Sequence, residues 1–317
     1  MNKKEKHVVL GANGNSGKAL IRHLFEKGYN VEGVSRSGKG PLEVKIIKAN
    51  ALNSSELEEA IVGADVIYHC LGIPYSKWFS DYPIIMKNLI NAASANGKCP
   101  KIIYVDNLYA YGEAGARLGP LSEKSPEIAN DKKGQLRKKL AQMLLHAHTE
   151  GNVRVAIGRA SDFYGPDTSN SLLSYMLFPK LMEGKSAAFF ATLDKKHSWM
   201  YLPDFVRALV VLGTQEEALG KVWILPHQPT MTITAFTERF YEIAEVDIPV
   251  KVKKTPQIIL TLGGLFNKDF REYGRVNYQM HMDWIVDDSK FKDIFDFNPT
   301  PLDQSIKETV DSYRIST

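Results

Sequence analysis

The sequence predicts an α/β fold, with a doubly wound parallel sheet in its first half and a smaller C-terminal α/β lobe after it. Three observations carry this prediction. Short apolar runs alternate with helical patterns, a glycine-rich turn follows the first apolar run, and the regular alternation fades after Gly158. The composition, 44% hydrophobic and 24% charged over 317 residues, is that of a globular chain long enough to bury a large core.

The expected elements follow from the spacing of apolar residues and from the glycines and prolines that bound them. Short apolar runs indicate buried strands, and apolar residues three or four apart indicate helices. Strands are predicted at 7–10, 31–34, 44–47, 66–70, 102–105 and 153–157, and helices at 16–27, 54–62, 83–95 and 131–149. Ser54 is the expected N-cap of the second helix. Strands that alternate with helices in this way pair in parallel through right-handed crossovers.

The same pattern predicts the division into domains. Residues 1–160 are expected to form the first domain, with a segment near 195–225 returning to it. Residues 161–317 are expected to form mainly the second lobe, where prolines separate shorter elements.

Composition and charge exclude several classes of protein. The formal net charge of +4 is spread along the chain, so no nucleic-acid partner is expected. Cys70 and Cys99 form no C-x-x-C pair and lie in no His/Cys cluster, which argues against a disulfide scaffold and a metal site. No signal segment and no run of eighteen apolar residues is present, so we expect a cytoplasmic protein without a membrane partner.

A G-x-x-G-x-x-G turn follows the first predicted strand and opens a helix. In such a turn one glycine permits the tight bend, a second lets the backbone approach a pyrophosphate, and a third lets helix and strand pack closely. The helix N-terminus presents N–H groups to the phosphates. The motif therefore predicts a Rossmann-type site for a dinucleotide. The residues of the turn expected to contact it are Gly11, Asn13, Gly14, Asn15, Ser16 and Gly17.

The end of the second strand indicates which dinucleotide binds. Sites selective for NAD place an acidic side chain there to accept hydrogen bonds from the adenosine ribose. This chain has Ser35 and Arg36 there, and no acidic residue occurs before Glu43. Because a guanidinium can pair with a 2′-phosphate, we expect NADP(H) in preference to NAD(H).

Further short motifs occur at the ends of the predicted strands and near the C-terminus. They are Ala49–Asn53, Ala64–Cys70, Asn88–Ala93, Tyr111–Gly112, Arg159, Tyr164–Pro166, Tyr201–Val206, Asp288–Phe291 and Phe297–Thr300. With the glycine turn, they make nearly the whole chain resemble an extended short-chain dehydrogenase/reductase of the NAD-dependent epimerase/dehydratase group. Asn50 replaces the aspartate that touches adenine in this group.

The resemblance implies an NAD(P)-dependent oxidoreductase or epimerase that acts on a carbonyl or hydroxyl of a small polar substrate, with nucleotide sugars as the commonest substrate type. The second lobe would then roof the substrate pocket. Further cofactor contacts are expected at Asn50, Ala51, Leu71 and Gly72, and substrate contacts at Tyr75, Tyr164 and His197. The resemblance also implies a homodimer through the helices at 83–95 and 131–149.

The catalytic residues depart from the family pattern. Members of the family use a Tyr-x-x-x-Lys pair and an upstream Ser or Thr, and the lysine lowers the pKa of the tyrosine. No tyrosine of this chain has a lysine four residues later. Alignment of the motifs puts Lys133 at the tyrosine, Arg137 at the lysine and Asn107 at the Ser/Thr.

Three interpretations of this departure remain open at this point. Lys133 could serve as the acid/base, its pKa lowered by burial and by Arg137. A tyrosine at the carboxyl ends of the strands could supply the proton, the candidates being Tyr111, Tyr109, Tyr164 and Tyr75. Alternatively no residue supplies it, and the protein is a catalytically silent sensor of the redox state of NADP(H).

Overall fold

The computed structural model describes residues 4–316 except 170 and 247–251. The chain folds into two compact units, each built from several segments. The first unit comprises residues 1–107, 136–159 and 206–223, and the second comprises 108–135, 160–205 and 224–317. The segment 108–135, which the sequence assigns to the first domain, thus belongs to the second unit.

The first unit contains a seven-stranded sheet in the order β11-β6-β5-β4-β1-β2-β3. Its strands are β1 Lys6–Leu10, β2 Asn30–Ser35, β3 Ile46–Lys48, β4 Val66–His69, β5 Lys101–Asn107, β6 Arg154–Ala160 and β11 Lys221–Ile224. β1 pairs in parallel with β2 and with β4, and β2–β3 and β4–β5 are parallel as well. The strand order reverses between β1 and β4, which is where ligands bind in doubly wound sheets. The predicted fold class is confirmed.

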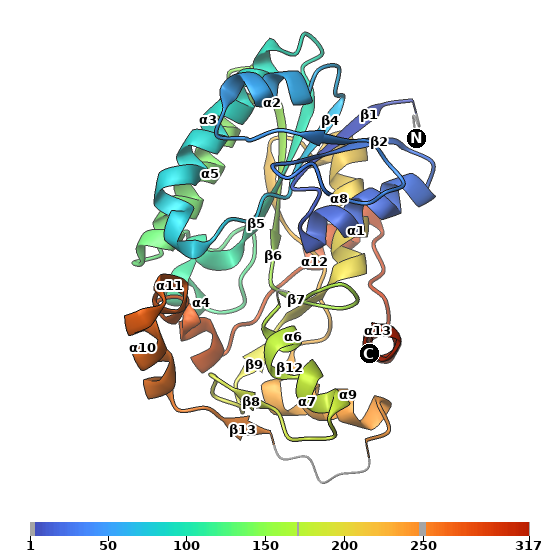
Figure 1. Ribbon diagram of the computed structural model, residues 1–317. Helices are drawn as coiled ribbons and strands as arrows, with labels where there is room; N and C mark the ends of the chain where they lie inside the picture. The colour runs from blue at the N-terminus through green and yellow to red at the C-terminus, as the bar shows by residue number, and fades with distance from the viewer. Residues whose placement is uncertain (1–3, 170, 247–251, 317) are drawn as a thin grey trace. The chain divides into compact units, whose positions relative to one another are not determined.

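Helices cover both faces of this sheet. They are α1 Asn15–Glu26, α2 Ser54–Ala60, α3 Trp78–Ala95, α5 Lys132–Thr149 and α8 Leu202–Thr214, with short 3-10 turns η1 Tyr75–Lys77 and η3 Glu216–Ala218. Figure 1 shows α3 and α5 on one side of the strands and α1 on the other. The first turn of α5 belongs to the second unit and the remainder to the first.

Several predicted element boundaries are wrong. The fifth and sixth strands extend to Asn107 and Ala160, beyond the predicted 105 and 157. The third strand covers Ile46–Lys48 rather than 44–47. The second helix begins at Ser54, but its N-cap is Asn53, whose side chain accepts hydrogen bonds from the N–H groups of Ser55 and Glu56. The third helix begins at Trp78 and contains Pro83 in its second turn, whereas the sequence suggested that Pro83 starts it.

The second unit is built from short elements around an aromatic core. They are η2 Leu108–Ala110, α4 Gly112–Ala116, β7 Asp162–Tyr164, α6 Leu172–Met176, α7 Phe178–Met182, β8 Ala188–Phe189, β9 Lys196–His197, β10 Trp199–Tyr201, β12 Met231–Thr232, α9 Ile233–Ile243, β13 Lys253–Lys254, α10 Gln257–Phe266, α11 Lys268–Gly274, η4 Asn277–His281, α12 Ser289–Phe295 and α13 Leu302–Ser316. Small two-stranded sheets pair β10 with β7, β12 with β9 and β13 with β8. The core includes Tyr164, Phe178, Trp199 and Phe236.

Candidate active site

The glycine turn lies between β1 and α1, beside the point where the strand order reverses. Gly11 has a φ of 97°, and a Cβ atom there would lie 2.6 Å from the carbonyl oxygen of Cys70 on the neighbouring chain segment. The N–H groups of Gly11 and Ala12 both donate to the carbonyl of Val34, at 2.9 and 3.0 Å. Gly11 is therefore required by the turn itself.

Gly17 and Gly14 differ in what surrounds them. A Cβ at Gly17 would lie 2.2 Å from the carbonyl oxygen of Gly11, so the close approach of α1 to the turn requires glycine. At Gly14 φ is −81°, and a Cβ would meet only the Gly11 oxygen at 3.4 Å. The chain itself thus leaves room for a side chain at position 14. A glycine there leaves the backbone open to a ligand.

The start of α1 suits a bound phosphate. Its N-cap residue is Gly14, which offers no side-chain cap, and its first turn contains no acidic residue. Asn13 and Gly14 are exposed, and Asn15 and Ser16 are half-buried. The dipole of this 12-residue helix and the N–H groups of its first turn would favour an anion.

The adenosine end of such a ligand would meet the loop after β2. Ser35 is buried and its hydroxyl donates to the carbonyl of Lys39 at 2.7 Å, which fixes the loop. Arg36 and Lys39 are exposed. The loop therefore presents basic side chains, as the sequence predicts.

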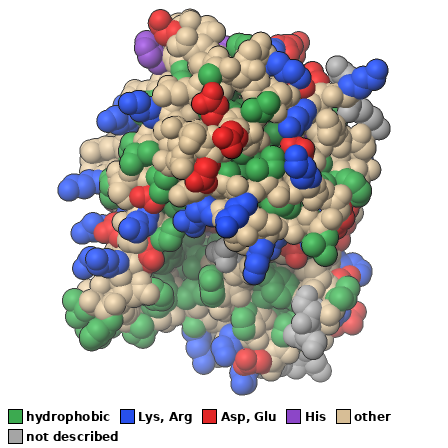
Figure 2. Space-filling model, turned by 45° about the horizontal axis from the view of Figure 1, so that its top comes forward, with side chains coloured by type: hydrophobic (Ala, Val, Ile, Leu, Met, Phe, Trp, Pro, Cys, Tyr) green, Lys and Arg blue, Asp and Glu red, His purple; other side chains and the backbone are tan. Residues whose placement is uncertain are grey.

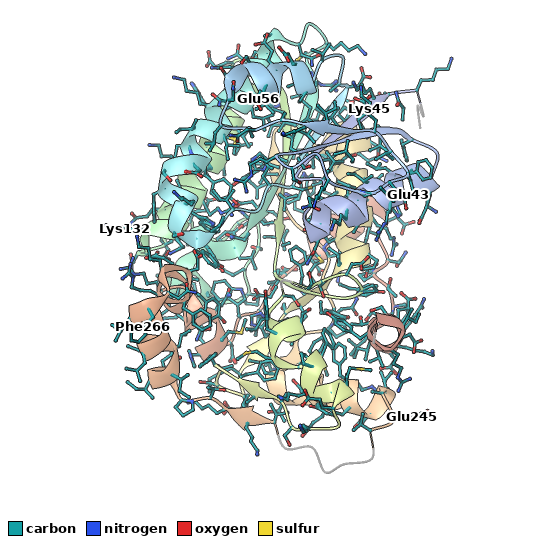
Figure 3. The ribbon with its side chains drawn as sticks, viewed as in Figure 1. Glu43, Lys45, Glu56, Lys132, Glu245 and Phe266 are labelled. Carbon is teal, nitrogen blue, oxygen red and sulfur yellow. The ribbon has the colours of Figure 1, made fainter. Side chains whose placement is uncertain are left out.

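Asn50 and Ala51 follow β3 and are held by the start of α2. The side-chain oxygen of Asn50 accepts a hydrogen bond from the backbone N–H of Leu52 at 3.2 Å. The backbone N–H of Asn50 donates to the carboxylate of Glu56 at 2.8 Å. Figure 3 labels Glu56 at this helix. The carbonyl of Ala51 accepts from the amide of Asn88 at 3.0 Å. These bonds fix the turn that replaces the aspartate segment of the family.

The segment after β4 is positioned by a tyrosine of α3. Tyr82 donates to the carbonyl of Leu71 at 3.0 Å, while Gly72 is exposed. His69, the last residue of β4, is buried against the rings of Tyr82 and Tyr104. Burial lowers the pKa of His69 to about 4, so the ring is neutral near pH 7.

Arg137 occupies an aromatic box within the first unit. Its guanidinium donates to the hydroxyls of Tyr104 at 2.7 Å and Tyr82 at 3.3 Å, and it lies over the rings of Trp78 and Tyr82 at 4.2 and 4.6 Å. Burial alone would lower the pKa of Arg137, but the two tyrosines and Asp106 raise it above its ordinary value. Arg137 therefore carries a permanent buried charge.

The carboxylate of Asp106 on β5 compensates the charge of Arg137 and also that of Arg159. Its carboxylate accepts from Nε of Arg159 at 3.0 Å and lies 3.5 Å from the guanidinium of Arg137. All three side chains are buried. Asn107, the next residue and the last of β5, is half-buried.

Lys133 is held within the second unit. Its side chain is 2% exposed, and its ammonium pairs with the carboxylate of Glu272 on α11 and contacts the Glu272 carbonyl at 3.3 Å. The ion pair gives this buried lysine a carboxylate counter-charge within the same unit.

The candidate tyrosines have different surroundings. Tyr109 and Tyr111 are buried in the second unit. Tyr164 is buried in its aromatic core, its hydroxyl bonds to Ser305, and burial raises its pKa above the ordinary value. Tyr75 belongs to the first unit, where its half-buried ring packs against Trp78 at 4.9 Å.

His197 and Cys70 are both buried. His197 bonds through Nε2 to Asp162 at 2.9 Å and packs against Trp199. Burial raises the pKa of Cys70 to about 12, which makes its thiol unreactive. Within the part of the chain that the structure describes, no cluster of three His, Cys, Asp or Glu residues could hold a metal ion, and no helix could cross a membrane.

Sequence reasoning missed the groups that surround the altered catalytic positions. These are Trp78, Tyr82, Tyr104 and Asp106 around Arg137, and Glu272 beside Lys133. A signal was available for part of this set. Tyr104 lies in the predicted strand 102–105, and Asp106, two residues on, shares its face of the sheet because β5 continues to Asn107. For Glu272, 139 residues from Lys133, the sequence gives no such signal.

Comparison with known proteins agrees with this architecture. A profile of the NAD dependent epimerase/dehydratase family matches residues 7–225. A comparison with curated proteins gives no significant match. Among solved structures, dTDP-glucose 4,6-dehydratase from Bacillus anthracis in complex with NAD has a TM-score of 0.78 at 16% identity, over 98% of this chain and 97% of that one.

Two epimerases show the same likeness. UDP-glucuronic acid 4-epimerase from Bacillus cereus, in complex with UDP-glucuronic acid and NAD, has a TM-score of 0.78 at 19% identity and covers 98% of this chain and 100% of its own. UDP-glucose 4-epimerase from Thermotoga maritima, with UDP-glucose, has a TM-score of 0.78 at 17% identity, over 98% of this chain and 99% of that one. At these identities the likeness shows the fold. The family profile covers more than half of the sequence, and the chain therefore belongs to the NAD-dependent epimerase/dehydratase family.

Proposed function

We propose that this protein is an NAD(P)-dependent enzyme that acts on a carbonyl or hydroxyl of a small polar substrate of the nucleotide-sugar class, with acid/base residues that differ from the usual Tyr, Lys and Ser. The family profile supports the class of enzyme. The similar structures are enzymes of UDP- or dTDP-sugars, two of them with a UDP-sugar bound, and this supports the substrate class.

The observation that carries the proposal is the unfilled space beside the backbone of Gly14. Gly11 and Gly17 are explained by the packing of the chain, whereas a Cβ at Gly14 would meet no contact closer than 3.4 Å. The open backbone at this position and the uncapped start of α1 fit a pyrophosphate. When bound there, a nicotinamide dinucleotide supplies hydride transfer, and this chain must supply the matching proton transfer.

Lys133 is the residue we propose for the proton transfer. It stands at the position of the family tyrosine, and its pairing with Glu272 gives it a route for passing a proton between ammonium and carboxylate. Arg137 is held by Tyr104, Tyr82 and Asp106, so we assign it a positioning role. It supports α3 and, through Tyr82, the Leu71 carbonyl near the expected cofactor.

For the choice of dinucleotide, we propose that Arg36 favours NADP(H). The loop after β2 carries exposed Arg36 and Lys39, and Ser35 takes the place of an acidic residue. Two of the similar structures named above contain NAD, so NAD(H) is the alternative outcome of the test.

The test combines nucleotide binding with turnover. Purified protein is titrated with NADPH and NADH by energy transfer from tryptophan, then incubated with a panel of UDP- and dTDP-sugars and analysed by NMR. The proposal expects binding of a reduced dinucleotide and conversion of at least one sugar nucleotide. Lys133→Met should then abolish conversion and leave dinucleotide binding intact. The neighbouring exposed Lys132 provides the matched control, Lys132→Met, which should retain both.

A redox sensor without turnover is the second candidate. The engagement of Lys133 and Arg137 in buried ion pairs favours it, because side chains held in this way can serve packing alone. Tight dinucleotide binding with no conversion of any sugar nucleotide or carbonyl compound would decide for the sensor. Absence of dinucleotide binding would reject both candidates. Light scattering of the same protein tests the homodimer that the family resemblance implies.

A further inference from the structure

The helical hairpin of α10 and α11 exposes an unusual number of apolar side chains. α10 contains no charged residue over its ten positions. Six large apolar side chains of the hairpin are exposed, namely Ile258, Ile259, Leu262, Leu265, Phe266 and Phe270. Phe266, at the turn between the helices, is 93% exposed and lies at the outer edge of the hairpin in Figure 3. A contiguous apolar surface of this kind marks an interaction site.

The hairpin does not need these side chains for its own folding. α10 buries Leu260 and Gly264. A Cβ at Gly264 would lie 3.1 Å from the Cα of Arg271, and one at Gly263 would lie 3.3 Å from the ring of Phe270, so the two glycines let α11 pack closely on α10. The remaining face of α10 is turned away from these contacts. Its apolar character is therefore available to a partner.

The exposed charged side chains around the apolar face are all basic. Lys253, Lys254, Lys268, Arg271 and Arg275 are exposed, whereas the acidic side chains of the fully described stretch 252–275, Asp269 and Glu272, are half-buried. Glu272 is also committed to Lys133 and Arg275. Figure 2 shows apolar side chains gathered at the lower left of the face in view, with lysine and arginine side chains close by.

We propose that the α10–α11 hairpin binds the surface of an anionic lipid bilayer, with the apolar side chains around Phe266 entering the interface and the basic side chains contacting the headgroups. An apolar helix face flanked by lysine and arginine is the pattern of helices that lie in the membrane interface. At about 1.5 Å per residue α10 reaches only about 15 Å, half of a hydrocarbon core of about 30 Å, so the hairpin lies on the bilayer and does not cross it.

A second copy of the chain fits this surface less well. A two-fold contact through the apolar face would set the basic side chains of one copy near those of the other, because both copies contribute the same surface. The half-buried acids of the hairpin could not compensate them. An anionic lipid surface satisfies the apolar and the basic residues together.

Sedimentation of the full chain with vesicles tests the proposal. The vesicles contain phosphatidylcholine alone or with about one third phosphatidylglycerol. Each Lys or Arg near such a surface contributes about fivefold to binding. We therefore expect binding to the anionic vesicles to exceed binding to the neutral ones by at least tenfold, and to fall as salt is raised.

Two double variants separate the apolar and basic contributions. Leu265→Ser with Phe266→Ser should lower binding at least tenfold, and Lys268→Glu with Arg271→Glu should lower it about 25-fold or more. The matched controls are Leu42→Ser, at a leucine that is 99% exposed in the first unit, and Lys27→Glu, at an exposed lysine of the same unit. Both controls should bind as the wild type does.

Circular dichroism and dinucleotide binding check that each variant is folded. Three outcomes overturn the proposal. They are failure of the wild type to bind anionic vesicles, unchanged binding by both double variants, and a dimer in light scattering that the Leu265→Ser/Phe266→Ser variant dissociates. The last outcome would make this surface a contact between copies of the chain. The test does not depend on turnover, so it stands apart from the proposed enzymatic function.

Discussion

Of the three glycines in the turn, Gly14 is the one that the fold itself does not require, so we attribute it to ligand binding. Gly11 has a positive φ, and Gly17 leaves no space for a Cβ, whereas Gly14 has an ordinary φ and the space for one. We therefore predict that Gly14→Ala lowers dinucleotide affinity at least tenfold, about 1.4 kcal/mol, at nearly unchanged thermal stability. Gly17→Ala should instead destabilise the fold by about 1–3 kcal/mol, because the added methyl group overlaps the Gly11 carbonyl.

Titration with the dinucleotide and thermal unfolding of the two variants measure this difference. Equal loss of stability in both would show that Gly14 serves the turn as Gly17 does. Equal dinucleotide affinity of Gly14→Ala and wild type would place the pyrophosphate elsewhere.

A second prediction about a single residue concerns Arg36, which we propose selects between the two dinucleotides. Its side chain is exposed after β2, within a loop that Ser35 fixes. Arg36→Ala should cost about 1.5–3 kcal/mol of NADPH affinity, the range for hydrogen bonds to charged groups, and leave NADH affinity unchanged. Titration of both nucleotides measures this. If the substitution weakens NADH and NADPH alike, Arg36 stacks on adenine or shapes the loop and does not select the phosphate.

Among the elements, α5 joins the two altered catalytic positions. Its first turn carries Lys133, paired with Glu272 in the second unit, and the next turn carries Arg137, held in the aromatic box of the first unit. A lysine and an arginine buried one turn apart on a helix are costly without acidic partners. The structure supplies Glu272 for Lys133, and for Arg137 it supplies Asp106, which Arg159 shares.

The pair of Lys133 and Glu272 can be tested as a pair. Glu272→Gln removes the carboxylate that pairs with the buried Lys133 and should cost about 3–5 kcal/mol of unfolding free energy. Lys133→Met should cost less, because Glu272 keeps its pair with Arg275. The double variant should cost less than the sum of the two, because neither charge is then left alone. Urea unfolding of the four proteins gives the coupling energy.

Lys132→Met controls for the loss of a lysine at the start of α5, since Lys132 is exposed, and it should change stability by about 0.5 kcal/mol or less. Additive costs in the double variant would mean that Lys133 and Glu272 do not form a pair in solution.

Elements whose ends are fixed by neighbouring residues could be predicted from the sequence. Elements and contacts that depend on residues far apart in the chain could not. The glycine turn and α1 follow from residues within one βαβ unit, and they were predicted to within a residue. The start of α3 was misplaced because proline is most frequent at the first position of a helix, while here Trp78 and Tyr82 extend the helix by packing around Arg137. The partner of Lys133 lies 139 residues away, beyond any local pattern.

For the molecule as a whole, two buried histidines govern the dependence of stability on pH. His7 on β1 bonds to the hydroxyl of Tyr68, and burial lowers its pKa to about 4. Burial also lowers the pKa of His69 on β4 to about 4. Both side chains lie in the central sheet. Protonation of either would place a charge inside the sheet.

The sign of the effect follows from proton binding. Between pH 4 and the ordinary histidine pKa of 6.5 the unfolded chain binds a proton at each histidine and the folded chain does not. The unfolding free energy therefore rises with pH across this window and is lost as the pH falls below 6.5. Each histidine should remove about 2 kcal/mol at about pH 5 relative to neutral pH.

Denaturant unfolding at a series of pH values measures this slope, and His69→Phe isolates one of its two components. The variant keeps an aromatic ring beside Tyr104 but binds no proton, so the slope between pH 5 and 6 should fall by about one proton even if its stability at neutral pH differs. A slope that His69→Phe does not alter would mean that the folded protein accommodates the charged ring. In that case Asp106 and the tyrosines around Arg137 would have to absorb a further positive charge, and the box would be far more polar than its contacts indicate.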